Sequence, residues 1–213
     1  MTLALFSYWR ATAPYRVRIG LALKGVKADH RPVDLAAGAQ NDAAYTAVNP
    51  QKLTPALLAD GEILTQSLAI LEWLEETHPD PPLLPPDPLA RARVRAMAGI
   101  IACDIHPLNN LRVLRALRSM GVGPEAEGDW IARWMREGFD ALEPMIRRHG
   151  RGYAYGEEPT IADCCLVPQV YSARRFGVDL AAYPALVGAA GRAESLPVVA
   201  AAHPDRQADA PPA

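Results

Sequence analysis

The chain of 213 residues has little lysine and cysteine, no net positive charge and no long apolar run. Its 22 lysines and arginines and its 24 acidic residues leave a formal charge of -2. Without a net basic field, the composition argues against nucleic acid and against an anionic membrane surface as partners. No apolar stretch reaches the roughly 18 residues of a membrane-spanning helix, and the N-terminus has no signal-peptide pattern. We therefore expect a cytoplasmic protein without a nucleic-acid or membrane partner.

The three cysteines argue against a disulfide framework. Cys164 and Cys165 are neighbours that could not easily bridge each other, and the odd count favours a reducing compartment. Both lie in an apolar helical stretch, where we expect them to act as small buried hydrophobes. Cys103 precedes His106 by a metal-like spacing, but two ligands do not make a zinc site, so we expect no metal.

Lysine is limited to Lys24, Lys27 and Lys52, so arginine carries nearly all of the positive charge. The planar guanidinium group fits a carboxylate better than an ammonium group does. Individual arginines are therefore candidate ligands for an acidic molecule.

Residues 3–25 join a buried-strand pattern to a helix start. An apolar strand is predicted over residues 3–8, and Pro14 fits the first helical position of a helix that continues to Lys24. Arg10 and Thr12 lie at the junction. The free N–H groups of a helix start favour a docked anion, so a thiolate could be held beside Thr12.

The first 80 residues have the pattern of a small α/β domain. A strand around residues 30–35 completes a βαβ unit, and Asp60-Gly61 predicts a hairpin between residues 56–59 and 62–64. Gln66 and Ser67 then open a helix that runs to about His78, with Ser67 as its N-cap. The order βαβ then ββα predicts a mixed sheet with helices packed on it.

Six of the 20 prolines fall in residues 79–88, which predicts an extended linker. Residues 89–203 have helical periodicity throughout, with a break at Pro107 and a structural capping box at Thr160 to Asp163. Helices are predicted around residues 131–146, over Thr160 to about Phe176, and as a weaker pair between 186 and 202. Residues 204–213 lack apolar periodicity, and we expect a disordered tail there.

This order resembles the cytosolic glutathione transferases, which join a thioredoxin-like domain, here residues 1–80, to an all-helical domain, here residues 89–203. Five blocks resemble the zeta class, the maleylacetoacetate and maleylpyruvate isomerases. They are SYWRATAPYRVRIGLALKG, NPQKLTPAL, QSLAILEWLEE, CDIHPLNNLRVL and TIADCCLVPQVYSARRF. The resemblance implies glutathione as cofactor, a homodimer and a small acidic substrate.

The resemblance also implies a glutathione site. Thr54-Pro55 matches a cis peptide whose backbone binds the cysteinyl part of glutathione. Gln66 and Ser67 match the residues that bind the γ-glutamyl end, although Ser67 could be an N-cap alone. His106 and Asn110 match residues that approach glutathione, in part across the dimer. Alternatively, they satisfy backbone groups freed by Pro107, the interpretation that we prefer for Asn109.

In the zeta isomerases, glutathione thiolate adds to the cis double bond of a maleyl compound, rotation follows, and elimination gives the fumaryl isomer. We expect the bidentate guanidinium groups of Arg10, Arg112 and Arg175 to bind the carboxylates of the substrate. Arg175 directly precedes Phe176, as in the zeta pattern, so we expect Arg174 to be a surface charge. Gln169 is a weaker candidate on the same helix.

The sequence departs from the zeta pattern beside Arg10. Zeta enzymes usually have Ser-Ser-Cys or Ser-Gly-Thr there, whereas this chain has Ala11-Thr12-Ala13. Thr12 is then the one side chain of the three with a hydroxyl for the sulfur, and the backbone amides of Ala11 and Ala13 complete its surroundings. Two functions follow. The first is a glutathione-dependent isomerase of maleylpyruvate or maleylacetoacetate in aromatic-compound catabolism. The alternative is a zeta-like transferase that conjugates or dehalogenates small acids, or a weakly active glutathione-binding protein.

Overall fold

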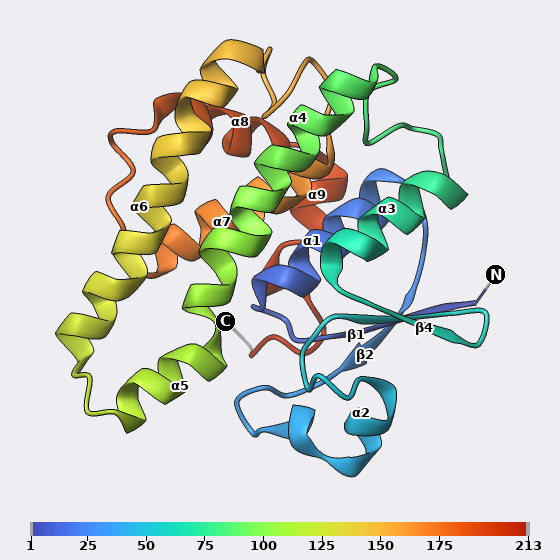
Figure 1. Cartoon of the computed structure of the whole chain (residues 1–213). Coiled ribbons are helices and arrows are strands. Elements are labelled where there is room, and N and C mark those ends of the chain that lie inside the picture. The colour runs from blue at the N-terminus through green and yellow to red at the C-terminus, as the bar shows by residue number, and fades with distance from the viewer. Residues whose placement is uncertain (1, 212–213) are drawn as a thin grey trace. The chain divides into compact units, whose positions relative to one another are not determined.

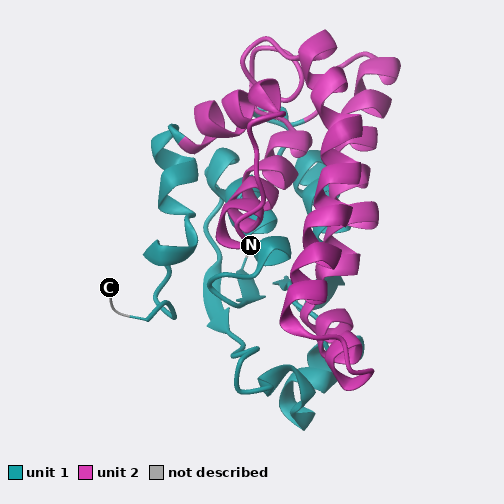
Figure 2. Cartoon of the chain, turned by 90° about the vertical axis from the view of Figure 1, so that its left-hand side faces the viewer, with its two compact units in different colours: residues 1–83, 195–213 teal, residues 84–194 magenta. Residues whose placement is uncertain are grey.

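A computed structural model describes residues 2–211 of the chain. Two compact units are present: the first runs up to Leu83 and resumes at Ser195, and the second is Leu84–Glu194 (Figure 2). The first boundary lies close to the predicted linker. The second differs from the prediction, which had kept residues 195–203 in the helical domain. The reason is that helix α9, Pro197–Ala201, packs against the first helix of the chain.

The first unit contains a four-stranded mixed sheet of order β2-β1-β3-β4 (Figure 1). Its strands are β1 Leu3–Ser7, β2 Asp29–Pro32, β3 Ala56–Ala59 and β4 Glu62–Thr65. β1 and β2 are parallel, and helix α1, Thr12–Leu23, connects them. The remaining neighbours are antiparallel. The predicted βαβ and ββα pattern is therefore confirmed, although β2 ends at Pro32, which has no N–H for the ladder.

Alternation along β1 places helices on both faces of the sheet. Leu5 packs with Val17 of α1 and Ile70 of helix α3, Ser67–Thr77, in one core cluster. The next residue, Phe6, points to the other face, where its ring lies 5.9 Å from that of Tyr45 in helix α2, Ala43–Val48. A single-turn 3-10 helix, Ala39–Asn41, precedes α2. Because side chains alternate with a period of two, the sheet is covered by α1 and α3 on one face and by α2 on the other.

Helices α1 and α3 are held close together along the C-terminal half of α1. Gly20 lies so near Leu71 that a Cβ atom at this position would overlap the leucine side chain. At the C-terminal end of α1, the buried Lys24 Nζ is 2.5 Å from Glu75 Oε2 and 2.7 Å from Pro81 O. The N–H of Leu83 donates to the same carboxylate. These contacts fix α1, which carries the predicted thiolate site, against α3, which carries Gln66 and Ser67 at its start.

The second unit is helical, as predicted. Its α-helices are α4 Pro88–Gly99, α5 Leu111–Ser119, α6 Pro124–His149, α7 Ile161–Arg175 and α8 Pro184–Glu194. Between α4 and α5 the chain forms a π-helical turn, Ile100–Ile105, and a 3-10 turn, His106–Asn109. This irregular segment confirms the predicted break at Pro107, because proline cannot donate to a regular helical ladder.

The C-terminal segment differs from the predicted disordered tail. Pro204–Arg206 forms a 3-10 turn, and the Gln207 side chain donates to the carbonyl groups of Ala201 and His203. Asp209 accepts the N–H of Trp9 at 2.9 Å. These are polar contacts rather than apolar packing, so hydrophobic periodicity gives no signal of them. Residues 212–213 of the predicted tail lie outside the described range.

Across residues 2–211, no helix has both the length and the apolar character that crossing a bilayer requires.

Candidate functional site

Three loops that carry predicted site residues leave the sheet at the same edge. Phe6 pairs with Ala56, and Ala56 pairs with Thr65, so the three residues lie in line across β1, β3 and β4. The loop after β1 leads to Thr12, the segment before β3 contains Thr54-Pro55, and the segment after β4 contains Gln66. The Thr54-Pro55 peptide is cis, as the resemblance implied.

Helix α1 begins without a side-chain cap among the described residues. Ala11 has the extended conformation of an N-cap residue, with φ -72° and ψ 129°, but its methyl group cannot accept a hydrogen bond. The N–H of Ala11 donates to Tyr8 O at 3.1 Å, and Pro14 has no N–H. The remaining donors of the first turn are the amides of Thr12 and Ala13. The helix start therefore offers two N–H groups and a positive partial charge to an anion.

The position of Pro14 corrects one sequence prediction. The helix starts at Thr12, so Pro14 is its third residue and not its first. The first turn tolerates proline because its N–H groups have no partner inside the helix. Pro14 removes one of these donors, which concentrates the open site on Thr12 and Ala13.

Helix α3 begins in an unusual backbone conformation. Gln66 precedes it with φ 67° and ψ 116°, a region that costs a non-glycine residue about 1–3 kcal/mol. The side chain of Gln66 donates to Gln51 Oε1 at 2.8 Å. Ser67 is the first helical residue and not the N-cap that the sequence predicted, because Gln66 occupies the cap position. Strain of this kind is characteristic of ligand-binding segments, which supports a binding role for the Gln66-Ser67 pair.

Arg16 lies directly behind Ser67 and was not identified from the sequence. This arginine is only 2% exposed, and its Nη1 lies 3.2 Å from Ser67 Oγ. A buried guanidinium adds positive charge to the start of α3, where an incoming carboxylate would be stabilised. The available signal was an arginine inside the apolar run between Tyr15 and Val17.

A second missed group orders the loop before Thr54. The Tyr45 hydroxyl and the Asn49 side-chain amide both donate to Leu53 O, at 2.6 and 2.7 Å. Burial raises the pKa of Tyr45 to about 12, so this hydroxyl stays a donor at neutral pH. Asn49 Oδ1 in turn accepts the N–H of Gln51. The signal was the Asn49-Pro50-Gln51 part of the zeta-like block, to which no role had been given.

Arg10 lies in a turn between β1 and α1. The N–H of Ala11 closes this turn on Tyr8 O, which leaves Trp9 and Arg10 at its corner. The exposed guanidinium of Arg10 is 5.5 Å from the ring centroid of Trp9. Thr12, two residues further on, is 6% exposed. The first unit therefore brings Arg10, Thr12, Thr54, Pro55, Gln66 and Ser67 to one edge of the sheet.

In the second unit, His106, Asn110 and Arg112 lie between the 3-10 turn and the first residues of α5. Asn110 is the N-cap of α5, and its Oδ1 accepts the N–H of Arg112 at 3.1 Å. The side-chain Oδ1 of Asn110 therefore caps α5, and its Nδ2 is the side-chain donor that a ligand would use. Asn109 donates to Ile131 O at 3.5 Å, which is a carbonyl group of α6 and not a backbone group freed by Pro107. Arg112 is exposed.

Helix α7 supplies the remaining predicted residues. Arg174 forms an exposed ion pair with Glu194 at 3.0 Å, in agreement with the predicted surface role. Arg175 is the last residue of the helix, and its guanidinium lies 4.5 Å from the Phe176 ring centroid. Cys164 and Cys165 are both buried, as predicted. Gln169 is buried in the same helix.

No group of three or more His, Cys, Asp or Glu side chains is placed to hold a metal ion within residues 2–211.

A mixed four-stranded sheet, a cis-proline segment and two helix starts at one edge fit the first domain of the glutathione transferase class. Residues 1–76 match the family model described as "Glutathione S-transferase, N-terminal domain". The match covers the segment of the first unit in which these features lie.

Three relatives refine this class. The maleylacetoacetate isomerase of Pseudomonas aeruginosa is 47% identical over 212 residues, which cover 98% of this chain and 99% of that protein. A solved structure of a zeta-class maleylpyruvate isomerase, a bacterial glutathione transferase, has a TM-score of 0.95 and 44% identity, with 98% and 100% of the two chains covered. The maleylacetoacetate isomerase of Anaeromyxobacter dehalogenans with bound glutathione has a TM-score of 0.90 and 48% identity, with 99% and 98% covered. The chain belongs to the maleylacetoacetate and maleylpyruvate isomerase family, the zeta class of glutathione transferases.

Proposed function

We propose that this protein is a glutathione-dependent isomerase that converts a maleyl diacid, maleylpyruvate or maleylacetoacetate, to its fumaryl isomer. One observation carries the proposal: the uncapped start of α1 lies at the same sheet edge as the cis Thr54-Pro55 peptide and the strained Gln66. Full-length similarity to isomerases of this kind supports it.

The residues at this edge fit glutathione. We assign two segments to the binding of the glutathione backbone: the cis peptide at Thr54-Pro55 and the Gln66-Ser67 start of α3. The charge of Arg16 lies behind Ser67. The amides of Thr12 and Ala13 lie next to the position proposed for the sulfur, whereas the amide of Ala11 donates to Tyr8 O. His106 and Asn110 are the further glutathione ligands that we propose from the second unit.

Bound glutathione supplies a thiolate nucleophile that adds reversibly to the cis double bond, so the protein needs no activated nucleophile of its own. Thr12 donates its hydroxyl to the sulfur, and the helix start lowers the free energy of the ionised form. Arg10, Arg112 and Arg175 bind the carboxylates of the acid and stabilise the negative charge that develops during the reaction.

The first domain is proposed to bind glutathione and the helical domain the acid. We also propose a homodimer, which a sizing column at low protein concentration tests directly. A cytoplasmic location is supported by the odd number of cysteines and by the adjacency of Cys164 and Cys165.

The experiment is an assay of the purified protein with glutathione and, in turn, maleylpyruvate and maleylacetoacetate, following loss of the absorbance of the cis isomer. A glutathione-dependent rate with either acid is the expected result. The alanines at positions 11 and 13 favour the alternative, a transferase that conjugates or dehalogenates small acids, or a weakly active protein. Glutathione binding without isomerisation of either acid would contradict the isomerase and support that alternative.

A further inference from the structure

The turn that carries Arg10 is held from outside by the C-terminal segment of the chain. Its own hydrogen bond, from Ala11 N–H to Tyr8 O, leaves both backbone groups of Trp9 without a partner inside the turn. The N–H of Trp9 donates to Asp209 Oδ2 at 2.9 Å, across 200 positions of sequence. Its carbonyl oxygen accepts Arg18 Nη2 at 2.8 Å. Both backbone groups next to Arg10 are therefore fixed.

Asp209 also lies beside His30 of β2. Its Oδ1 lies 3.6 Å from His30 Nε2, and that nitrogen lies 2.9 Å from Ser7 Oγ at the end of β1. The Asp209 side chain is 14% exposed, so solvent screens these contacts little. The Asp209 carboxylate thus accepts the backbone N–H of the turn and lies beside His30, whose ring reaches the last residue of β1.

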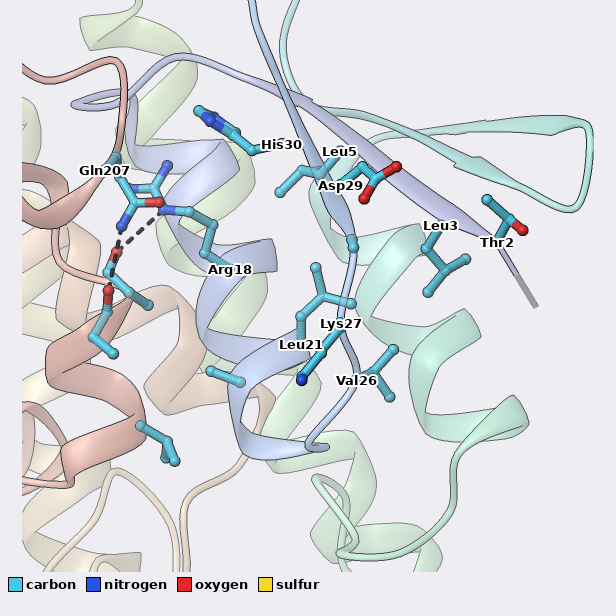
Figure 3. Close-up of a pocket in the computed structure, with 15 residues that line it drawn as sticks. Thr2, Leu3, Leu5, Arg18, Leu21, Val26, Lys27, Asp29, His30 and Gln207 are labelled. Atoms are coloured by element: carbon cyan, nitrogen blue, oxygen red, sulfur yellow. Dashed lines mark hydrogen bonds between the residues drawn. The ribbon is translucent and has the colours of Figure 1, made fainter.

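Arg18 forms the second connection. Its Nε donates to Ala202 O at 3.1 Å, just after α9, while its Nη2 holds Trp9. Figure 3 shows this hydrogen bond beside that of Gln207 to the carbonyl of Ala201. A cavity of about 630 Å³ lies between this segment and the surface of α1 and β2, with Arg18, His30 and Gln207 among its lining residues. Polar contacts therefore hold this segment in addition to the packing of α9 on α1, and losing one should be measurable.

We propose that Asp209 is a positioning residue for the isomerisation: it holds the Trp9 backbone so that Arg10 is presented to the acid beside the start of α1. The kinetic part of this inference rests on the proposed function. Asp209 acts on the turn and not on Thr54, Pro55, Gln66 or Ser67, which are held by other contacts. Its loss should therefore impair use of the acid while leaving glutathione binding intact.

The test compares Asp209→Ala and Asp209→Asn with Asp205→Ala in the full-length protein. Asp205→Ala is a matched control because it removes the same charge from the same segment. The side chain of Asp205 is 69% exposed and pairs with His203. The alanine variant removes the acceptor for Trp9. The asparagine variant keeps a neutral acceptor and loses the charge, which roughly halves the strength of such a hydrogen bond.

Two measurements are made on each variant. Amide hydrogen exchange of the peptide containing residues 8–11 reports on the turn and requires no turnover, so it remains decisive if the wild-type protein isomerises neither acid. Kinetics then separate kcat/KM for the acid from the Kd of glutathione.

In Asp209→Ala we expect faster amide exchange in residues 8–11. The kcat/KM for the acid should fall by about tenfold, the loss expected for one charge-assisted hydrogen bond. The Kd of glutathione should stay within about twofold of wild type. Asp209→Asn should lose about threefold. If the alanine variant does not fold, this smaller loss in Asp209→Asn supports the proposal and an unchanged rate overturns it. Exchange and kinetics equal to those of Asp205→Ala would overturn it, as would a parallel loss of glutathione binding and rate.

Discussion

The starts of α1 and α7 differ in how their first N–H groups are satisfied. At α7, Thr160 accepts the N–H of Ala162, and Asp163 accepts the N–H and hydroxyl of Thr160 as well as the N–H of Ala154. At α1, Ala11 occupies the corresponding cap position and offers no acceptor. One helix start is closed by its own side chains, and the other leaves its donors to an anion.

The difference separates a structural helix start from a binding one. The side-chain oxygens of Thr160 and Asp163 all have partners in the same unit, so this motif stabilises the fold. The start of α1 gives up the roughly 0.5–2 kcal/mol that an Asp or Ser cap provides. That cost is reasonable where a bound thiolate supplies the missing negative charge. The same reasoning applies to α3, whose cap position holds the strained Gln66.

Removing the carboxylate at the closed start should have the largest effect. Asp163→Ala leaves the N–H groups of Ala154 and Thr160 without acceptors at a site where Asp163 is 1% exposed. We expect the free energy of unfolding to fall by about 3–5 kcal/mol, since each buried unpaired donor costs about 1–3 kcal/mol. Denaturant unfolding measures this loss. Activity per folded molecule should not change, and a stability loss under about 1 kcal/mol would contradict the role given to the motif.

The closed start should also make stability depend on pH. Burial raises the pKa of Asp163 from 3.8 to about 6. Because the folded state binds this proton more tightly than the unfolded state, the stabilisation from this group is complete below about pH 3.8 and is lost as the pH rises through 6. Unfolding measured from pH 4 to 7 should show this decline, and Asp163→Asn should lack it. An equal decline in both proteins would assign it to other groups.

At the open start, the expected effect is on the sulfur and not on the fold. Thr12→Ala removes a hydrogen bond to a charged group, worth roughly 1.5–3 kcal/mol, so the pKa of bound glutathione should rise by about one to two units. The pH–rate profile measures the shift, and Thr12→Ser is the control that keeps the hydroxyl. An unchanged profile in Thr12→Ala would mean that the backbone amides alone hold the thiolate.

Adding a cap acceptor to the start of α1 tests whether its free N–H groups bind the anion. Ala11→Asp places a cap acceptor on a residue that already has the extended backbone of an N-cap. It should raise the free energy of unfolding by about 0.5–2 kcal/mol while lowering the glutathione-dependent rate, because its carboxylate repels the thiolate. Unfolding and kinetics are measured on the same preparation. A variant that is more stable and equally active would show that the start of α1 does not bind the anion.

The sequence predicted best what depends on neighbouring residues. Thr160 to Asp163 and Asp60-Gly61 are local motifs, and both are confirmed, the latter with φ of 48° and 96° as a two-residue hairpin turn requires. Ser67 was misplaced because serine prefers the N-cap, whereas here Gln66 takes that position with a rare positive φ.

Contacts between distant residues were not predictable from local patterns. Arg16 reaches Ser67 across 51 positions, and Asp209 reaches Trp9 across 200. Neither contact leaves a periodicity or a spacing in the chain, since each depends on how α1 and the C-terminal segment pack. The roles of Arg10, Arg112 and Arg175 remain predictions from the resemblance.

A pH titration of the ultraviolet absorbance of glutathione thiolate, bound to the wild-type protein and free in solution, tests the open helix start most directly. Stabilisation by the amides of Thr12 and Ala13 and by the Thr12 hydroxyl predicts a bound thiol pKa at least one unit below that of free glutathione, whose thiol resembles an ordinary cysteine near about 8.5. A bound thiol that titrates at the same pH as free glutathione would contradict the assignment of α1 as the thiolate site.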